Sequence, residues 1–312
     1  MSASTVSYWN KTATAPLFPR LEKNLICDVL IIGGGITGVT AAYCLAEKGE
    51  KPVLIEAGAL CDGTTGNTTG KVTVQHGLIY GNILKKHGRS FARAYAESQS
   101  EALLFVRRMA RDLAVDCGLL ESPACVYAES DLEREELVRE YQTAMDLGID
   151  AYFEEAPAFP AGSYGLLGFR RQLAFHPVRY VSALAAAAAE KGARIYCGTK
   201  AVRLEDGEVK TIHCEGGLTI EARHVIMATQ YPFYDGPNLF FARLYPKRAY
   251  GLAVEPLRDW PDGLYINAGQ PARSIRAHFE NGRKILIVVG ESHPTGRGAE
   301  NEEEHFDNLR RF

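Results

Sequence analysis

The chain has 312 residues, of which 46% are hydrophobic and 23% are charged, and its formal net charge is −3. This length and composition are typical of an ordinary globular protein with one large domain or two closely joined ones. The small negative charge excludes the basic footprint of proteins that bind nucleic acid or anionic membranes.

The seven cysteines are scattered, odd in number and never spaced as CxxC. This pattern predicts free thiols in a reducing compartment and argues against a disulfide framework, a zinc ribbon or an iron–sulfur site, so no metal is expected. The first twenty residues lack a basic start followed by an apolar block, and no apolar run approaches the roughly 18 residues that span a bilayer. We therefore predict a cytoplasmic protein without a signal peptide or a membrane span.

The first strong pattern is "DVLIIGGGITGVTAAYCLAEKGEKPVLIE" at residues 28–56. Val29–Ile32 is a short apolar run, typical of a strand that is buried on both faces of a parallel sheet. From Ile36 the apolar spacing becomes that of a helix, which Gly49 can end in the left-handed conformation. Pro52–Ile55 then predicts a second strand, which completes a strand–helix–strand unit.

Three glycines at the first turn of this unit match the GxGxxG pattern of dinucleotide-binding proteins. Gly33 permits the tight turn, Gly35 lets the backbone approach a pyrophosphate, and Gly38 lets the helix lie close to the strand. The helix N-terminus offers unpaired N–H groups and a partial positive charge to the diphosphate. Glu56 follows Gly38 at close to the expected offset of about 20 residues for an acid that binds a ribose. Its carboxylate disfavours NADP, but this unit alone does not separate NAD from FAD.

The segment "CDGTTGNTTGKVTVQHG" at residues 61–77 is rich in glycine and threonine, with little apolar content before Val72. A linker would have a similar composition. Its position directly after a nucleotide-binding strand favours a loop whose backbone N–H groups and hydroxyls follow the diphosphate toward a flavin ring.

These motifs, GGGITG, the strand end at Glu56 and "TTGNTTGKVTVQHG", resemble FAD-dependent oxidoreductases of the D-amino-acid oxidase/glycine oxidase superfamily. The resemblance is strongest to a bacterial subgroup often fused to a C-terminal Rieske domain. Residues 175–205, 222–233 and 274–298 resemble further segments of these proteins, so nearly the whole chain is covered. The resemblance implies an α/β fold: a Rossmann-like FAD-binding domain of the GR2 type with an inserted α+β substrate domain built on a mostly antiparallel sheet.

The resemblance also implies FAD as the cofactor. Val202 is expected to read the adenine through its backbone, and Ala228 and Thr229 to end a strand that packs near the cofactor. The positions carried over as FAD contacts are Gly33, Gly35, Ile36, Thr37, Gly38, Glu56, Ala57, Thr64, Thr65, Thr68, Thr69, Gly70, Val202, Ala228 and Thr229.

Residues 78–174 interrupt the nucleotide-binding pattern. Seven residues, mostly apolar, keep a spacing of three to four and predict a long amphipathic helix with one stripe in the core; they are Phe91, Tyr95, Ser98, Ala102, Phe105, Met109 and Leu113. "ACVYAES" predicts a strand, and "DLEREELVREYQTAMDLG" a helix with a solvated, charge-rich face. Residues 238–290 alternate short strands with turns.

We predict an FAD-binding domain at 1–77 plus 175–237, with its C-terminal closing segment missing, and a substrate domain at 78–174 plus 238–312. His176 precedes Pro177, a good first helical residue. This position favours a capping or packing role for His176 over that of a catalytic base.

The resemblance implies oxidation of the C–N bond of a small-molecule amine or amino acid. Flavin N5 would take the hydride, and the electrons would then pass to oxygen or a redox partner. Lys71 and His76 are the candidate catalytic residues, because they follow the threonine loop where it is expected to reach the flavin. A surface charge and a satisfied loop residue are the alternative interpretations of these two side chains.

Basic clusters offer a further hypothesis, since a guanidinium can bind a substrate carboxylate with two parallel hydrogen bonds. A solvated basic face is the favoured explanation. The residues concerned are Arg243, Lys247, Arg248 and Tyr250, and also Arg170 and Arg171.

Two features depart from the family pattern. The chain ends at "NEEEHFDNLRRF", where relatives continue to a final strand and helix, and the paired Cys and His motifs of a Rieske domain are absent. Our hypothesis is therefore that the chain is a fragment, and an FAD-binding remnant or electron-transfer subunit without independent turnover is the alternative function. An NAD-dependent dehydrogenase is less favoured, because it predicts a continuous second nucleotide-binding half after residue 80.

Overall fold

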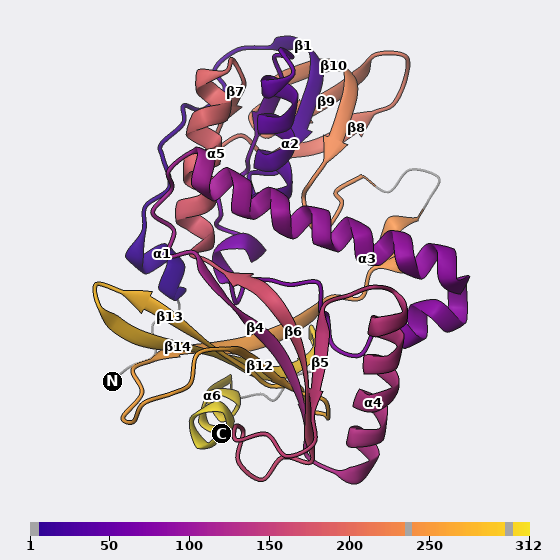
Figure 1. Cartoon of the computed structure of the whole chain (residues 1–312). Coiled ribbons are helices and arrows are strands. Elements are labelled where there is room, and N and C mark those ends of the chain that lie inside the picture. The colour runs from indigo at the N-terminus through magenta and orange to yellow at the C-terminus, as the bar shows by residue number, and fades with distance from the viewer. Residues whose placement is uncertain (1–5, 235–238, 297–301) are drawn as a thin grey trace. The chain divides into compact units, whose positions relative to one another are not determined.

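A computed structural model describes residues 6–234, 239–296 and 302–312, and its chain folds into two compact units (Figure 1). Unit 1 comprises Met1–Thr68, Ala110–Cys117 and His176–Tyr245, and unit 2 comprises Thr69–Met109, Gly118–Phe175 and Pro246–Phe312. Each unit contains its own sheet and core clusters. The domain boundaries predicted at 77/78, 174/175 and 237/238 stay predictions.

Unit 1 is built on the six-stranded sheet A, with the strand order β7-β2-β1-β10-β9-β8. Its elements are α1 (Tyr8–Thr12), β1 (Leu25–Ile32), α2 (Ile36–Glu47), β2 (Val53–Ile55), the 3₁₀ turn η1 (Thr64–Asn67), α5 (Pro177–Glu190), β7 (Arg194–Tyr196), β8 (Ala201–Glu205), β9 (Lys210–Cys214), β10 (Thr219–Met227) and the 3₁₀ turn η3 (Phe240–Arg243). Strands β7, β2, β1 and β10 run parallel, and β9 and β8 continue the sheet antiparallel. Because β2 and β10 flank β1 on opposite sides, the strand order reverses at β1, where ligands bind in open α/β sheets.

The apolar spacing after the glycine turn forms α2 as predicted. Val39, Ala42, Tyr43 and Ala46 are its buried residues. Gly49 follows the helix with φ +88°, and its N–H donates to the carbonyl of Ala46 at 3.0 Å. The left-handed end expected of this glycine is therefore confirmed. Helix α2 packs against α5 (Figure 1).

Helix α5 begins at Pro177 with His176 as its N-cap. The His176 Nδ1 accepts a hydrogen bond from the backbone N–H of Arg179 at 3.4 Å, and its Nε2 lies 3.0 Å from the Thr12 hydroxyl. The imidazole is fully buried and packs edge-on against Trp9, with ring centroids 4.8 Å apart. The predicted capping and packing role of His176 is confirmed.

Unit 2 is built on sheet B, an eight-stranded sheet with the order β11-β14-β13-β12-β4-β6-β3, in which β5 also pairs with β6. Its elements are β3 (Lys71–Val72), α3 (Tyr80–Asp112, whose last residues belong to unit 1), β4 (Leu120–Ala128), α4 (Asp131–Asp146), β5 (Ala151–Glu154), β6 (Gly165–Ala174), β11 (Lys247–Val254), β12 (Leu264–Asn267), β13 (Ser274–Glu280), β14 (Arg283–Pro294) and α6 (Glu302–Arg311). Among the strands described, β12 and β4 form the parallel pair and the other pairs are antiparallel. The mostly antiparallel sheet that the resemblance implied is confirmed, and its assignment to a substrate domain stays a prediction.

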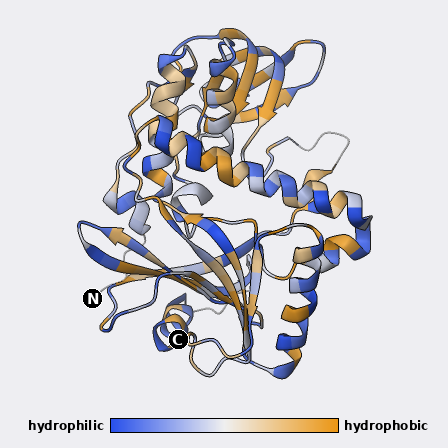
Figure 2. Cartoon of the chain, viewed as in Figure 1, coloured by the Kyte–Doolittle hydropathy of each residue, from blue (hydrophilic) through white to orange (hydrophobic). Residues whose placement is uncertain are grey.

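Helix α3 is long and amphipathic, as Figure 2 shows along its length, but it bends at Gly88, where φ is +80°. The predicted core stripe is only partly right: Met109 is buried and Tyr95 packs against the core of unit 2, but Phe91 is 53% exposed, and Ala92 and Ala96 are buried in its place. The helical period predicts that a buried face exists. It does not fix which of two adjacent stripes is buried, and the small alanines allow the closer packing.

Helix α4 has the predicted charge-rich face but also buries one of its acids. The carboxylate oxygens of Glu140 accept hydrogen bonds from the backbone N–H groups of Tyr80 at 2.6 Å and Gly81 at 2.8 Å. Burial raises the pKa of Glu140, and these N–H groups oppose that shift. Glu140 thus serves the first turn of α3 as a cap supplied from another helix.

The predicted basic cluster is spread over two elements. Arg243 lies in η3, while Lys247 and Arg248 lie on β11 and are exposed. Tyr250 on the same strand is buried, and the Arg248 guanidinium pairs with Glu302 of α6 at 2.5 Å. The favoured interpretation of a solvated basic face agrees with these exposures.

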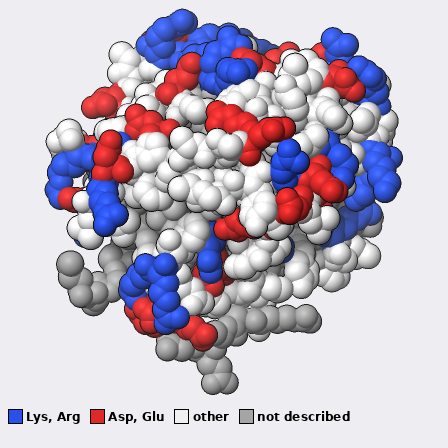
Figure 3. All heavy atoms as spheres, turned by 60° about the horizontal axis from the view of Figure 1, so that its bottom comes forward, with Lys and Arg blue, Asp and Glu red and all other residues white. Residues whose placement is uncertain are grey.

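The charged side chains on the surface agree with the small net charge of the sequence. In the face drawn in Figure 3, acidic and basic residues are interspersed without an extended field of one sign. No helix within residues 6–234, 239–296 and 302–312 is long and apolar enough to cross a bilayer. All seven cysteines are free thiols.

Replacing His176 with Ala should lower the free energy of unfolding by about 1–2 kcal/mol, because the N-cap bond of α5 is lost. Urea denaturation followed by circular dichroism measures this loss. His224→Ala, at an exposed position of β10, is the matched control and should change stability by less than about 0.5 kcal/mol. An equal effect of both substitutions would contradict the capping role.

Candidate functional site

The candidate site lies in unit 1, where the parallel strands β2, β1 and β10 end. Gly33 follows β1 with φ +117°, and its N–H donates to the carbonyl of Ile55 at 2.8 Å. A Cβ added to Gly33 would stand 2.4 Å from the carbonyl oxygen of Ala228. Gly33 therefore turns the chain in a space bounded by the ends of both neighbouring strands, and no side chain fits there.

Gly38 brings α2 close to β1. A Cβ at Gly38 would stand only 1.9 Å from the carbonyl oxygen of Gly33, so the predicted close approach of helix and strand is confirmed. Gly35 is the N-cap of α2 and offers no capping side chain; instead the Thr65 hydroxyl oxygen accepts from the N–H of Ile36 at 3.0 Å. The approach of a pyrophosphate to Gly35 stays a prediction.

Glu56 ends β2 and is held by backbone amides. One carboxylate oxygen accepts from the N–H of Gly34 at 2.6 Å, and the other from the N–H of Gly58 at 2.9 Å. The acid thus secures the glycine turn, a role that the spacing of the sequence did not indicate. Each carboxylate oxygen keeps a second lone pair, so binding of a ribose hydroxyl is compatible with these bonds and stays a prediction.

The threonine loop is ordered by side chains that the sequence did not single out. The Thr64 hydroxyl donates to the side-chain oxygen of Gln230, which follows β10. From α1, the Trp9 indole N–H donates to the carbonyl of Thr68 at 2.7 Å, and Ser7 donates to the carbonyl of Gly66. The aromatic pair Tyr8-Trp9 in a mostly polar N-terminal segment is the sequence signal that could have indicated these contacts with the threonine loop.

The other predicted cofactor contacts of unit 1 lie around the same edge of sheet A. Thr37 and Ala57 are exposed next to the glycine turn and Glu56. The Ala228 N–H donates to the carbonyl of Ile32 at 2.8 Å, and Thr229 follows it. Val202 lies on β8, 46% exposed, shortly after the chain passes the end of β2, where the N–H of Thr199 donates to the Glu56 carbonyl at 2.8 Å. Their contacts with a cofactor stay predictions.

The remainder of the threonine loop belongs to unit 2. The carbonyl of Thr69 accepts from the Arg276 Nε at 2.6 Å, and the carbonyl of Gly70 accepts from the N–H of Phe175 at 2.9 Å. Lys71 then enters β3, which pairs with the end of β6. The loop is thus fixed to unit 2 on both sides of Gly70.

Arg276 on β13 is the buried cation that holds this loop, and it was missed from the sequence. It is 1% exposed, and its guanidinium also donates to the carbonyls of Phe175 at 3.0 Å and Ala277 at 3.2 Å. A charged residue between two apolar neighbours of a strand was the available signal.

Lys71 and His76, the candidate catalytic residues, lie in unit 2. Lys71 is half-buried; burial lowers the pKa of its ammonium to about 8, and the nearby Arg276 charge acts in the same direction. In the part of the chain that the structure describes, no carboxylate forms an ion pair with Lys71. His76 is exposed, and its Nδ1 lies 3.0 Å from the Tyr95 hydroxyl. The protonation of Lys71 can therefore change just above neutral pH, whereas burial lowers the pKa of His76 from its ordinary value.

The residues of unit 1 fit a dinucleotide. No side chain would fit at Gly33 or Gly38. The N-terminus of α2 has no capping side chain from its N-cap residue, and the carboxylate of Glu56 lies at the end of the neighbouring strand β2. Within the described ranges, no group of three or more His, Cys, Asp or Glu side chains could hold a metal ion.

Comparison with known proteins agrees with a dinucleotide-binding site in this chain. The family model described as FAD dependent oxidoreductase (DAO) matches residues 28–312. The chain is 36% identical over 306 residues to "Putative Rieske 2Fe-2S iron-sulfur protein YhfW" of Bacillus subtilis, covering 98% of this chain and 60% of that protein. It is 30% identical to "Probable oxidoreductase OrdL" of Rhizobium meliloti, covering 82% of this chain and 59% of that protein. The chain thus spans about 60% of the length of these curated relatives.

Among solved structures, the chain is similar to glycine oxidase from Geobacillus kaustophilus, with a TM-score of 0.72 at 18% sequence identity. The similarity covers 92% of this chain and 76% of that structure. At this identity the likeness shows the fold, an α/β arrangement with a mixed sheet A and a mostly antiparallel sheet B.

Replacing Glu56 with Ala should weaken FAD binding about tenfold to a hundredfold, because a charge-assisted hydrogen bond and the support of the glycine turn are lost. Fluorescence titration of the apoprotein with FAD measures the dissociation constant. Glu50→Ala, at an exposed position before β2, is the control and should leave it unchanged. Equal FAD affinity in Glu56→Ala and the unmodified chain would show that the site has been wrongly placed.

Lys71→Met should stabilise the FAD-free protein at pH 7 and stabilise it less as the pH rises. The folded pKa of Lys71 is about 8 and its ordinary value is 10.5, so between these values the unfolded chain binds the extra proton. Stability of the unmodified chain therefore rises with pH across this window, and Lys71→Met should remove that contribution.

Urea midpoints at about pH 7 and about pH 9.5 test this difference. Lys51→Met, at an exposed position, is the matched control. If the gap between Lys71→Met and the unmodified chain does not narrow with pH, the lysine is not buried as described.

Proposed function

The chain belongs to the DAO family of FAD-dependent oxidoreductases, and from this premise we propose that it oxidises the C–N bond of a small-molecule amine or amino acid. FAD is the cofactor of this family, which decides the choice between NAD and FAD. The main structural support for this proposal is the glycine turn, where neighbouring backbone leaves no room for a side chain at Gly33 or Gly38. Glu56, at the end of the adjoining strand, accepts a hydrogen bond from this turn. The substrate class is supported by the similarity in fold to a glycine oxidase.

The chemistry divides between the cofactor and the chain. When bound, FAD accepts a hydride at N5 and passes the electrons to oxygen or to a redox partner. In unit 1, the predicted FAD contacts would hold the diphosphate at the N-terminus of α2 and the ribose at Glu56. The chain's own tasks are to bind the cofactor, to orient the substrate and to manage one proton.

The proton must be managed because an amine donates a hydride only in its neutral form. Amines and amino acids arrive as ammonium ions near neutral pH, so a nearby base raises the reactive fraction. Lys71 suits this role: its pKa of about 8 lets it lose a proton easily, and its position is held by β3 and by the Thr69–Arg276 contact. His76 is the second candidate, with Tyr95 at 3.0 Å to orient its ring.

Reconstitution with FAD and a visible spectrum provide the first test. A bound flavin should give absorption bands near about 375 and about 450 nm. Anaerobic addition of a panel of amines and amino acids should then bleach the longer-wavelength band for at least one class. A protein that stays colourless after incubation with FAD would contradict the cofactor assignment. A yellow protein that no amine bleaches would support the alternative of an FAD-binding subunit without independent turnover.

Lys71→Met should lower kcat/KM for the best substrate by about a hundredfold or more and remove the ionisation near pH 8 from the pH profile. Stopped-flow rates of flavin bleaching across pH measure both effects. His76→Asn separates the second candidate, and Lys51→Met is the control. An unchanged pH profile in Lys71→Met would exclude Lys71 as the proton acceptor.

A further inference from the structure

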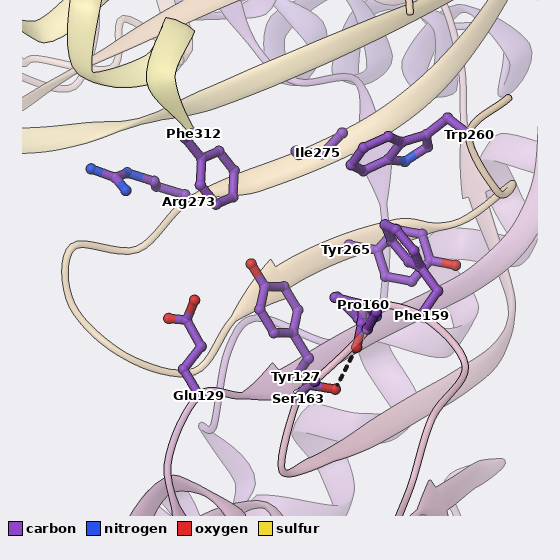
Figure 4. Close-up of a pocket in the computed structure, with 12 residues that line it drawn as sticks. Tyr127, Glu129, Phe159, Pro160, Ser163, Trp260, Tyr265, Arg273, Ile275 and Phe312 are labelled. Atoms are coloured by element: carbon purple, nitrogen blue, oxygen red, sulfur yellow. Dashed lines mark hydrogen bonds between the residues drawn. The ribbon is translucent and has the colours of Figure 1, made fainter. Parts of the chain in front are cut away.

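The chain has two tryptophans, and their indole N–H groups differ. The Trp9 indole is 2% exposed and donates to the carbonyl of Thr68 at 2.7 Å. Trp260 lies in unit 2, where it lines a cavity of about 430 Å³ together with Glu129 (Figure 4). Its indole N–H is buried and has no acceptor among the residues that the structure describes. The indole of Trp9 is thus the one that binds the threonine loop.

Helix α1, which carries Trp9, is anchored to the start of α5. The Trp9 ring packs edge-on against His176, and the Thr12 hydroxyl lies 3.0 Å from His176 Nε2. The Arg179 guanidinium donates to the carbonyl of Thr12 at 3.4 Å. Because His176 is itself fully buried and caps α5, these contacts give Trp9 a fixed place from which to bind the loop.

The N-terminal end of α1 contacts the loop at a second point. The Ser7 hydroxyl oxygen accepts from the N–H of Asn10 at 3.2 Å, and the hydroxyl donates to the carbonyl of Gly66. A Cβ added to Gly66 would stand 2.7 Å from the side-chain amide of Asn10 and 2.2 Å from the carbonyl oxygen of Cys61. The loop backbone therefore lies directly against α1, and two of its carbonyls are held by side chains of this segment.

A bond to a carbonyl also fixes the N–H group of the next residue. The peptide group is planar and trans, so its C=O and N–H point in opposite directions. The bond from Trp9 to the carbonyl of Thr68 therefore turns the N–H of Thr69 away from the indole. In the part of the chain that the structure describes, this N–H has no acceptor, and Thr69 is only half-buried. An acceptor atom of a ligand can reach this N–H and satisfy it.

The place of Thr69 in the loop indicates which half of FAD this N–H meets. Gly35 and Glu56 are predicted to hold the diphosphate and the ribose. The flavin ring is expected beside Lys71, the proposed proton acceptor. Thr69 precedes Lys71 by two residues, at most about 7 Å of chain, and so belongs to the flavin end of the loop.

We propose that Trp9 is a positioning residue for the flavin. By holding the carbonyl of Thr68, it presets the N–H of Thr69 as a hydrogen-bond donor to the flavin half of FAD. A loop that is fixed before binding loses less freedom when the ligand binds, so this preorganisation strengthens FAD binding. The inference rests on the proposed function, because FAD is the ligand, and it assigns to α1 a role in the cofactor site although α1 contains none of the predicted FAD contacts.

Isothermal titration of the apoprotein with FAD and with ADP tests the proposal. ADP has the adenosine and diphosphate of FAD but lacks the flavin half. Trp9→Phe keeps an aromatic ring beside His176 and removes the N–H donor. It should weaken FAD binding about threefold to tenfold, the range for one lost hydrogen bond, and leave the affinity for ADP unchanged. A general loss of structure in unit 1 would weaken the binding of both ligands.

The second tryptophan provides the matched control. Trp260→Phe makes the same change at an indole N–H that has no acceptor among the described residues, so it should leave both affinities unchanged. Ser7→Ala is a second variant; it removes the bond to Gly66 and should also weaken FAD binding. Circular dichroism confirms that each variant is folded.

Hydrogen exchange of the Thr69 amide, followed by nuclear magnetic resonance, is a direct measure of the proposed bond. In the unmodified chain, FAD should slow this exchange and ADP should not, because the flavin half supplies the acceptor. In Trp9→Phe, FAD should slow the exchange less. An exchange rate of Thr69 that FAD leaves unchanged would refute the proposed bond.

The affinities can overturn the proposal independently. Equal FAD affinity in folded Trp9→Phe and the unmodified chain would do so, and so would an equal loss of affinity for FAD and ADP. A chain that shows the expected differences but oxidises no amine would refute the proposed oxidation and leave the role of Trp9 supported. A chain that binds no FAD at all would overturn both.

Discussion

Unit 1 of this protein depends on the contact between the first turn of α2 and the end of β1. A side chain at Gly38 would stand 1.9 Å from the carbonyl of Gly33, so the helix can approach its strand only because glycine occupies this position. Gly33 in turn is enclosed by the ends of β2 and β10. The Glu56 carboxylate then accepts hydrogen bonds from the N–H groups of Gly34 and Gly58, so this acid helps to hold the shape of the turn.

Unit 2 is stabilised by buried polar groups, and no comparable glycine turn is involved in the residues that the structure describes. The Arg276 guanidinium binds the carbonyls of Thr69 and Phe175, and Glu140 accepts from the first N–H groups of α3. Both side chains are almost fully buried. Removing either would leave several backbone groups without partners, and a buried polar group without a partner costs more than an ordinary hydrogen bond contributes. Arg276 also helps to position Lys71 by holding Thr69, and its charge contributes to the lowered pKa of the Lys71 ammonium.

Much of the fold and part of the site were predictable. The strand–helix–strand unit, the ends of α2 and the capping role of His176 were expected from residues close together in sequence, and the character of sheet B was implied by the family resemblance. The buried stripe of α3 was predicted at Phe91, whereas Ala92 and Ala96 are buried. Periodicity establishes that a helix has a buried face, but neighbouring elements decide its rotation about the axis. The support of the threonine loop by Trp9 was not expected, because the aromatic pair Tyr8-Trp9 indicates a packed segment but not that its partner is Thr68.

By itself, the sequence determined the dinucleotide-binding unit and the position of the glycine turn and its acid, whereas the family and FAD were implied by the resemblance of its motifs. These features depend on backbone conformations that only certain residues adopt, at spacings set by a single strand and helix. Tertiary structure alone decided which side chains from distant segments meet. Arg276 reaches Thr69 across 207 residues of chain, and Glu129 shares a cavity with Trp260. Such contacts are created by the pairing order of sheet B, because strands that are far apart along the chain become neighbours only when the sheet is assembled.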